Sequence, residues 1–257
     1  MRSFLSNRFE RKYVLSESRA RAIRQFIQPY VRPDENLRPH HTRGYPVHSL
    51  YLDSPDLMLY RSGKDGHKNR FKLRIRYYSD APEAPIFCEI KRRVDQIIRK
   101  QRCKLRRQAL EGILAGHPLA PGDTAAAGKA AKDLEDFLAL RRDVASRPTL
   151  IVSYHREAWL DVATGDGRLT FDRDLSASRF DAAKGLVVDH PPVRGHEGKV
   201  ILEMKYVNRL PAWMQGLVHT FGLNRQSVPK YGWSVESIGE RRVARWARST
   251  DRVQRIA

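Results

Sequence analysis

Charged and apolar residues alternate in three consecutive segments, 71–78, 87–91 and 100–104. Because successive side chains of a strand point to opposite faces, each segment places its charges on one face and residues such as Leu73 and Ile90 on the other. The pattern predicts three strands of a sheet that has one packed face and one strongly basic face. Such a basic face is unstable unless water or an anion fills the space beside it.

The same alternation predicts further strands, and helical spacing of apolar residues predicts helices between them. The expected strands are 7–15, 45–53, 150–162, 167–172 and 199–207. The expected helices are 16–27, 57–62, 106–116, 134–144, 211–221 and 232–245. Strands and helices do not alternate strictly, which favours an α+β fold with a mainly antiparallel sheet. The many charged inward positions favour closure of that sheet into a β-barrel with a wet interior and flanking helices.

The chain of 257 residues, of which 41% are hydrophobic, is long enough for one large domain. We expect a single domain over 1–257, with a helical insertion at about 106–147 and a basic C-terminal helix at about 232–257. No apolar run reaches the length of a transmembrane helix or a signal peptide, which predicts a cytoplasmic protein. Cys88 and Cys103 lack metal-ligand spacing and are expected to be reduced thiols.

The formal net charge of +19 and a pI of about 10.3 indicate a polyanionic partner. Composition alone leaves open nucleic acid, an anionic membrane and a phosphate-rich small molecule. Many cations lie inside the predicted strands, and no interleaved exposed aromatic residues form a platform for base stacking. We therefore expect no specific nucleic-acid partner.

The alternation selects a set of inward-facing candidates in which cations outnumber carboxylates. The cations are Lys12, Arg74, Arg76, Lys91, Lys100, Arg102, Arg156, Arg168 and Lys205, and the carboxylates are Glu10, Glu89 and Glu203. Lys230 lies just before the last predicted helix. Such an excess suits a polyphosphate, because arginine offers bidentate geometry to phosphate oxygens and lysine a compact charge. The carboxylates suit Mg²⁺ or Mn²⁺, which prefer oxygen ligands.

Short motifs in a fixed order resemble the VTC (vacuolar transporter chaperone) domain of the triphosphate tunnel metalloenzyme, or CYTH-like, superfamily. The motifs are Glu-Arg-Lys-Tyr, Ser-Leu-Tyr-Leu-Asp, Lys-Leu-Arg-Ile-Arg, Cys-Glu-Ile-Lys, Arg-Lys-Gln-Arg, Ser-Tyr-His-Arg-Glu-Ala-Trp, Arg-Leu-Thr-Phe-Asp, Leu-Glu-Met-Lys and Val-Pro-Lys-Tyr. The resemblance extends from about residue 7 to 238. It implies an eight-stranded antiparallel tunnel that admits triphosphate.

The resemblance also implies an activity, since the best-known family members are polyphosphate polymerases. They transfer the γ-phosphate of ATP to a growing polyphosphate chain with a divalent metal, usually manganese. Matched by motif, phosphate binding falls to Lys12, Arg74, Arg76, Lys91, Lys100, Arg156, Arg168 and Lys230. Of these, Arg74, Arg76, Arg156 and Lys230 are the expected catalytic residues. Glu203 is the expected metal ligand, with Glu10 beside it and Glu89 as a ligand of second rank or an internal partner of Lys91.

Two departures from the family pattern affect the expected function. The superfamily signature Glu-X-Glu-X-Lys has Arg8 in place of its first glutamate, which favours chain extension or chain binding over a two-metal triphosphatase. The chain has no room for the regulatory SPX domain or the transmembrane segments of the eukaryotic proteins, so any translocation of product needs a separate membrane protein. The alternatives to a polymerase are a triphosphate or nucleotide hydrolase of the same fold and a non-catalytic polyphosphate-binding module.

Overall fold

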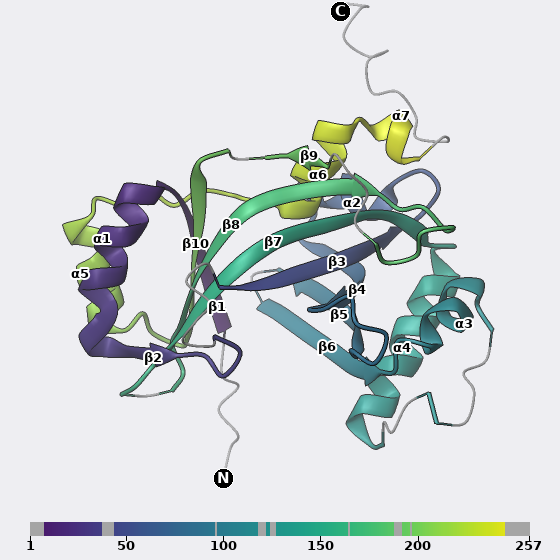
Figure 1. The fold of residues 1–257 in the computed structure, drawn as a ribbon, viewed down its shortest axis with the longest axis horizontal. Coiled ribbons are helices and arrows are strands. Elements are labelled where there is room, and N and C mark those ends of the chain that lie inside the picture. Colours follow the sequence, from purple (N-terminus) through teal and green to yellow (C-terminus); the bar gives the residue numbers. More distant parts are fainter. Residues whose placement is uncertain are drawn as a thin grey trace, which may run out of the picture. The chain divides into compact units, whose positions relative to one another are not determined.

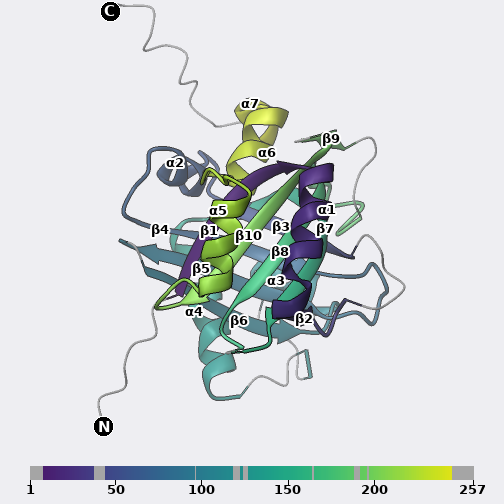
Figure 2. The same cartoon turned by 90° about the vertical axis from the view of Figure 1, so that its left-hand side faces the viewer.

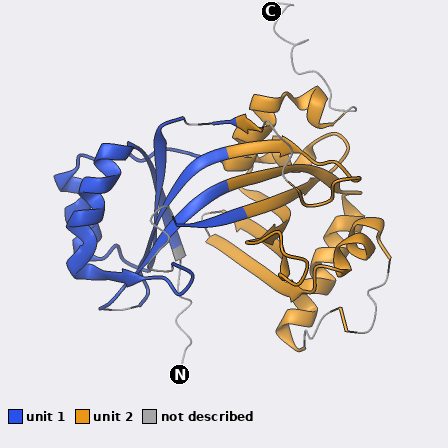
Figure 3. Ribbon diagram, in the orientation of Figure 1, with its two compact units in different colours: residues 1–47, 154–175, 194–229 blue, residues 48–153, 176–193, 230–257 orange. Residues whose placement is uncertain are grey.

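The computed structural model describes residues 8–37, 44–95, 97–117, 122–123, 127–163, 165–187, 192–195 and 197–244. The chain forms two compact units, shown in blue and orange in Figure 3. Unit 1 comprises residues 1–47, 154–175 and 194–229, and unit 2 comprises 48–153, 176–193 and 230–257. Strands β3 (Tyr45–Asp53), β7 (Arg147–Asp161) and β8 (Arg168–Arg179) each continue from one unit into the other.

Strands dominate the fold, and helices flank the sheet that they form (Figure 1). The remaining strands are β1 (Arg8–Ser16), β2 (Val31–Pro33), β4 (Asn69–Tyr77), β5 (Ile86–Val94), β6 (Ile97–Leu105), β9 (Val193–Arg194) and β10 (Lys199–Val207). The main path runs β1-β10-β8-β7-β3-β4-β5-β6, with β2 beside β7 and β9 beside β8. The α+β fold with a mainly antiparallel sheet is therefore confirmed. Within the described residues the path ends at β1 and β6, and no pairing of these two strands closes it.

Unit 1 packs two helices against one face of its strands. Ser16 caps the N-terminus of helix α1 (Glu17–Ile27), because its side chain accepts a hydrogen bond from the Arg19 N–H at 3.2 Å. Its apolar side chains join those of α5 (Ala212–Thr220) and of the strands in one buried cluster. The cluster includes Tyr13, Leu15, Ile23, Phe171, Leu202, Met204 and Leu217. Figure 2 shows α1 and α5 side by side. The opposite strand face is left for polar residues.

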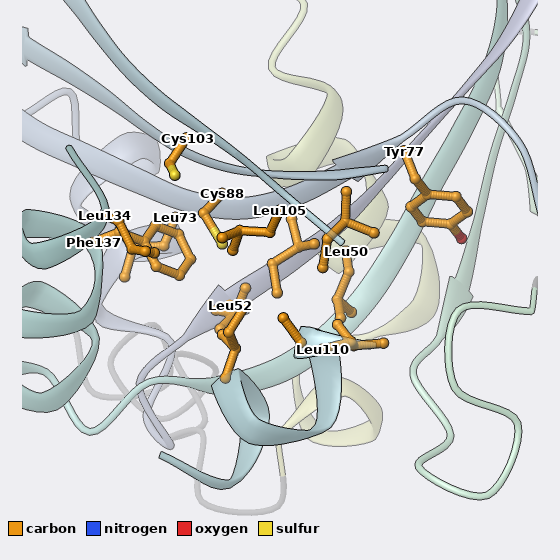
Figure 4. Packing of buried hydrophobic residues seen from close by; sticks show 14 of the residues in the cluster. Leu50, Leu52, Leu73, Tyr77, Cys88, Cys103, Leu105, Leu110, Leu134 and Phe137 are labelled. Atoms are coloured by element: carbon orange, nitrogen blue, oxygen red, sulfur yellow. The ribbon is translucent and has the colours of Figure 1, made fainter. Parts of the chain in front are cut away.

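Unit 2 has its own core beneath β3, β4, β5 and β6. Helices α3 (Ala109–Ala115) and α4 (Lys129–Asp143) supply its other side. The labelled core residues in Figure 4 are Leu50, Leu52, Leu73, Tyr77, Cys88, Cys103, Leu105, Leu110, Leu134 and Phe137. Cys88 and Cys103 lie directly opposite each other as buried free thiols. The alternate residues of these strands therefore point to the other face, which carries the charges.

Among the described residues of unit 2, the helices outside the predicted insertion are α2 (Met58–Lys64), α6 (Lys230–Ile238) and α7 (Glu240–Val243). A short 3₁₀ turn, η1 (Gln28–Tyr30), follows α1 in unit 1. The single helix predicted for 232–245 is instead two helices, α6 and α7, with a break at Gly239, and residues 245–257 lie outside the described part of the chain. The single-domain organisation stays a prediction. No helix among the described residues is long and apolar enough to span a membrane.

Strand β8 continues to Arg179, beyond the predicted end at residue 172. Asp174 has a φ of 54°, in the left-handed region that strand residues rarely adopt. Such a residue interrupts the alternation, as at a β-bulge. At Asp174 the alternation that predicted the strand is interrupted, but the strand itself continues to Arg179.

Candidate anion-binding site

Three neighbouring strands of unit 2 align their charged residues in rows across the sheet. Lys72, Lys91 and Lys100 lie opposite one another on β4, β5 and β6. The next row is Arg74, Glu89 and Arg102, and the third is Arg76, Phe87 and Lys104. We call these nine residues the cation grid. Like charges directly opposite in a sheet are destabilising, so seven cations around one carboxylate favour the binding of an anion.

Glu89 lies at the centre of the cation grid with no exposed surface. Its Oε2 accepts hydrogen bonds from Arg74 at 2.6 and 2.7 Å, and its Oε1 lies 2.7 Å from the Lys100 Nζ. Burial raises the pKa of Glu89, but the charges of Arg74, Arg76 and Lys100 outweigh burial and hold the pKa well below its usual range. The carboxylate therefore stays ionised and holds the cations around it.

Two titratable groups show that Glu89 does not neutralise the cation grid. Burial and the neighbouring charges of Arg74 and Arg76 lower the pKa of Lys100 to about 7, although Glu89 opposes this effect. Burial raises the pKa of the Tyr51 phenol, but Arg74 and Lys72 outweigh it and lower that pKa to about 8. Excess positive charge remains at this face, which is the electrostatic condition for binding a polyanion.

A buried hydrogen bond positions α6, whose first residue is Lys230. Tyr231 stacks on Tyr51 with ring centroids 4.5 Å apart, and its hydroxyl donates to Asp53 Oδ2 at 2.7 Å. Asp53 also accepts the backbone N–H groups of Leu59 and Tyr60 at the start of α2. The motif that contains Lys230 is thereby joined to the strand that contains Tyr51. Tyr51 in turn accepts a hydrogen bond from Arg74 of the cation grid at 3.4 Å.

The remaining candidates form a second cluster in unit 1, on the polar face of β1, β10, β8 and β7. Lys12 lies 3.1 Å from Glu10 and 3.3 Å from Glu203. Lys205 lies 3.0 Å from the other oxygen of Glu203. We call this group, with Arg156, Arg168, Thr170, Asp172 and Asp34, the carboxylate cluster. The carboxylate cluster brings together Glu10 and Glu203, the two predicted metal ligands that belong to unit 1.

Arg156 is the most deeply engaged cation of the carboxylate cluster. It donates two hydrogen bonds of 2.7 Å to Asp172 and one of 3.3 Å to Glu203. Burial opposes its charge, but Asp172 and Glu203 raise the pKa of Arg156 well above its ordinary value. Arg168 pairs with Asp34 at 2.9 Å. Neither Asp34 nor Asp172 was among the predicted site residues.

The two clusters differ in charge balance. The carboxylate cluster pairs four cations, Lys12, Arg156, Arg168 and Lys205, with four carboxylates, Glu10, Asp34, Asp172 and Glu203. The predicted excess of cations therefore belongs to unit 2. The cation grid holds the predicted residues Arg74, Arg76, Glu89, Lys91, Lys100 and Arg102, and it adds Lys72 and Lys104. Both additions continue a spacing of two residues that was visible in the sequence.

The carboxylate cluster suits a divalent cation that takes part of its coordination from a phosphate ligand. Within the described residues no three His, Cys, Asp or Glu side chains gather as a complete protein site. Glu10 and Glu203 nevertheless provide two carboxylates near one ammonium group, and Thr170, opposite Glu203, has a buried hydroxyl that finds no hydrogen-bond partner in the described part of the chain. Mg²⁺ and Mn²⁺ are commonly held by one or two carboxylates together with substrate phosphates and water. These donors fit that chemistry.

The fold and the cation grid define an α+β protein with a sheet face suited to polyanions. A family model described as the VTC domain matches residues 7–238, and the chain belongs to this family. The family prediction is therefore confirmed.

Comparison with individual proteins adds one named relative. No curated protein matches the chain. Among 23 matching chains of solved structures is a protein from Bacillus halodurans that is provisionally called an adenylate cyclase. It is 15% identical, the match covers 85% of this chain and 91% of that one, and the TM-score is 0.48.

Proposed function

We propose that the protein is a polyphosphate polymerase that transfers the γ-phosphate of ATP to a growing inorganic polyphosphate chain. The observation that carries the proposal is the cation grid, in which seven cations surround one buried carboxylate. A polyphosphate carries about one charge per phosphoryl unit, so its repeated charges match cations that repeat along and across the strands. Membership of the VTC family supports the same assignment.

The reaction proposed for this site is an in-line displacement. A terminal oxygen of the polyphosphate chain forms a bond to the γ-phosphorus, the bond from that phosphorus to the β–γ bridging oxygen breaks, and ADP leaves with the electron pair. Catalysis of this step requires positioning and neutralisation of charge on the equatorial oxygens. We assign those contacts to Arg74, Arg76, Arg156 and Lys230.

The other predicted cations bind phosphates that do not react. In the proposal these are Lys12, Lys91, Lys100, Arg102, Arg168 and Lys205, to which the cation grid adds Lys72 and Lys104. Arg74 and Lys100 are held by Glu89 before any substrate binds, at 2.6 and 2.7 Å respectively. Such preorganisation reduces the entropy lost when the phosphates are bound.

Glu203 and Glu10 are the residues proposed to hold Mn²⁺ or Mg²⁺. When bound, such an ion neutralises charge on the β- and γ-phosphate oxygens. Lys12 and Lys205 contact the two Glu203 oxygens at 3.3 and 3.0 Å and orient the carboxylate. Glu89 is surrounded by cations of the grid, and we assign it to their positioning in preference to metal binding.

Replacement of Glu203 tests whether polymer formation from ATP can be lost while binding of polyphosphate is kept. Glu203→Gln should lower polymer formation from ATP and Mn²⁺ by about a hundredfold or more, because metal affinity depends strongly on its ligands. Binding of preformed polyphosphate should remain within about twofold of the wild type, since the cation grid is unchanged. Gel analysis of polymer length measures the first quantity and calorimetric titration the second. Equal polymer formation by the variant would contradict the assignment of Glu203.

A non-catalytic polyphosphate-binding module is the second candidate function. It is favoured by the engagement of Glu203, which contacts Lys12, Lys205 and Arg156 within 3.3 Å and is thus already neutralised by the protein. Tight binding of polyphosphate by the wild type without consumption of ATP, with every divalent metal offered, would establish this candidate. Release of orthophosphate alone would instead indicate a hydrolase of the same fold.

A further inference from the structure

The β5–β6 hairpin exposes two aliphatic side chains at its closed end. Val94 is 47% exposed and Ile97 is 45% exposed, and the two residues lie opposite each other in the last pair of the ladder. We call these two residues the hairpin tip. Aliphatic side chains gain nothing from contact with water, and about half of each of these two residues is exposed, whereas the core residues of the same strands are buried.

Arginine residues surround the hairpin tip on both faces of the sheet. Arg93 lies one position before Val94 and is opposite Arg70 on β4. Arg92 and Arg99 are opposite each other in the ladder. Because successive side chains of a strand point to opposite faces, Arg92 and Arg99 lie on the sheet face opposite to that of Arg93. One carboxylate, that of Asp95, lies in the adjacent turn. The hairpin end is thus an apolar pair within a girdle of four arginines.

The arginine girdle is unfavourable in the protein alone. Arg92 and Arg99 form a direct cross-strand pair of like charges. Arg92 has partial support from Gln101, to which its Nε donates at 3.3 Å, and Arg93 donates to the Asp95 carbonyl at 2.7 Å. These contacts orient the side chains without neutralising their charge. An external anion would offset the repulsion.

We propose that the hairpin tip docks on an anionic lipid bilayer, with Val94 and Ile97 entering the interfacial layer and the arginines binding lipid phosphates. An apolar insertion within a basic girdle matches both parts of a membrane surface, its hydrocarbon boundary and its negative headgroups. The polyphosphate that the cation grid is proposed to bind does not account for the pattern. A polyphosphate chain gains nothing from contact with the exposed side chains of Val94 and Ile97. In addition, Arg92 and Arg99 point away from the sheet face that carries the cation grid.

Vesicle co-sedimentation of the whole chain tests this surface. The wild type should bind vesicles of phosphatidylcholine mixed with phosphatidylglycerol and should not bind pure phosphatidylcholine. The double variant Val94→Ser/Ile97→Ser should bind the mixed vesicles at least about tenfold more weakly, because it loses the apolar contribution. Arg99→Gln should weaken binding about fivefold, the effect of one basic residue at an anionic surface.

Matched controls identify the location of the effect. Val162→Ser removes a valine that is 54% exposed elsewhere, and Arg21→Gln removes an arginine whose side chain is 75% exposed on α1. Both should bind the mixed vesicles within about twofold of the wild type. The hairpin-tip variant should bind tripolyphosphate like the wild type, so loss of vesicle binding is separate from the proposed enzymatic function. Unchanged vesicle binding by Val94→Ser/Ile97→Ser would overturn the proposal and leave a purely electrostatic contact with an acidic surface.

A reporter at the hairpin tip distinguishes insertion from surface adsorption. The native thiols Cys88 and Cys103 are buried, and burial raises the pKa of Cys88, so a new surface cysteine can be labelled selectively. A polarity-sensitive fluorophore on Ile97→Cys should shift to shorter wavelength with the mixed vesicles, whereas the same label on Val162→Cys should not shift. Equal spectra at position 97 with and without vesicles would overturn the insertion.

Discussion

Glu89 determines how a basic sheet face can exist before any ligand is bound. It is fully buried, it contacts Arg74 and Lys100 within 2.7 Å, and Arg102 lies 3.5 Å away. Removal of one partner of a buried ion pair is strongly unfavourable because the other charge remains without compensation. Glu89 therefore stabilises the folded protein and holds the cations in place, and its contribution to stability can be measured.

Glu89→Gln should lower the free energy of unfolding by about 3–5 kcal/mol in buffer free of polyanions. Added tripolyphosphate should restore part of the loss, because a ligand that binds the folded state alone stabilises it. Denaturant unfolding with and without the ligand measures both effects. The control Glu111→Gln, at an exposed position on α3, should change stability by less than about 0.5 kcal/mol. A Glu89→Gln protein as stable as the wild type without ligand would contradict the proposed role.

Lys100 gives the cation grid a dependence on pH near neutrality. Its pKa of about 7 in the unliganded protein means that it gains charge as the pH falls from about 8 to about 6. Polyphosphate binding should strengthen over this interval. Lys100→Arg should lack this step because a guanidinium stays charged throughout, whereas Lys104→Arg, which keeps Lys100, should retain it. Calorimetric titration at constant ionic strength measures the effect, and identical profiles for the wild type and Lys100→Arg would exclude it.

At the level of elements, period-two alternation was sufficient to predict the strands that form both clusters. It placed Arg74 with Arg76 and Glu10 with Lys12 on common faces, as the structure does. Lys72 carried the same signal, two residues before Arg74, but was not included. Alternation is local, and the rows of the cation grid depend on register, which non-local packing and turns determine. The alignment of Lys72 with Lys91 and Lys100 could therefore not be derived from the sequence.

The contacts of the carboxylate cluster could likewise not be derived from alternation along single strands. Asp172 shares a predicted strand face with Arg168, so the sequence contained its position but not its partner, Arg156 of the neighbouring strand. Asp34 follows the three-residue strand β2, which is too short for alternation to identify. The charge balance of unit 1 was missed because both acidic partners depend on contacts between segments distant in the sequence. For this reason, a count of the cations on the predicted strand faces overestimated the net positive charge of the carboxylate cluster.

A buried hydrogen bond from Tyr231 of α6 to Asp53 of β3 contributes to the connection between β3, α2 and α6. Tyr231→Phe should lower the free energy of unfolding by about 1–3 kcal/mol, because Asp53 is buried and loses the Tyr231 donor. It should also lower polymer formation, since Lys230 adjoins Tyr231 at the start of α6.

Tyr60→Phe is the matched control for Tyr231→Phe. Its hydroxyl donates to Glu240 and Glu236, which are not part of the Asp53 network. It should leave polymer formation unchanged. Stability and polymer formation of Tyr231→Phe equal to those of the wild type would show that Asp53 does not need this partner. Denaturant unfolding and the gel assay provide the two readings.

At the scale of the whole molecule, the charged residues behind the net charge of +19 are distributed unevenly between the two units. Unit 1 pairs its inward cations with carboxylates, whereas unit 2 concentrates unbalanced cations on the sheet face of the cation grid. We interpret the first as the part that orients carboxylates for a metal and the second as the part that holds phosphates. The arginines around the hairpin tip form a separate basic region of unit 2, and neither of these two roles accounts for them.

The polymerase that we propose joins the γ-phosphate of ATP to polyphosphate. The most direct measurement follows ATP radiolabelled at the γ-phosphate, incubated with the protein and Mn²⁺, and separates polymer, ADP, ATP and orthophosphate. For a polymerase, label should enter long polymer in equal amount to the ADP formed, and Arg74→Gln should strongly reduce both. Label that appears solely as orthophosphate, or that remains in ATP while polyphosphate binds tightly, would contradict this proposal.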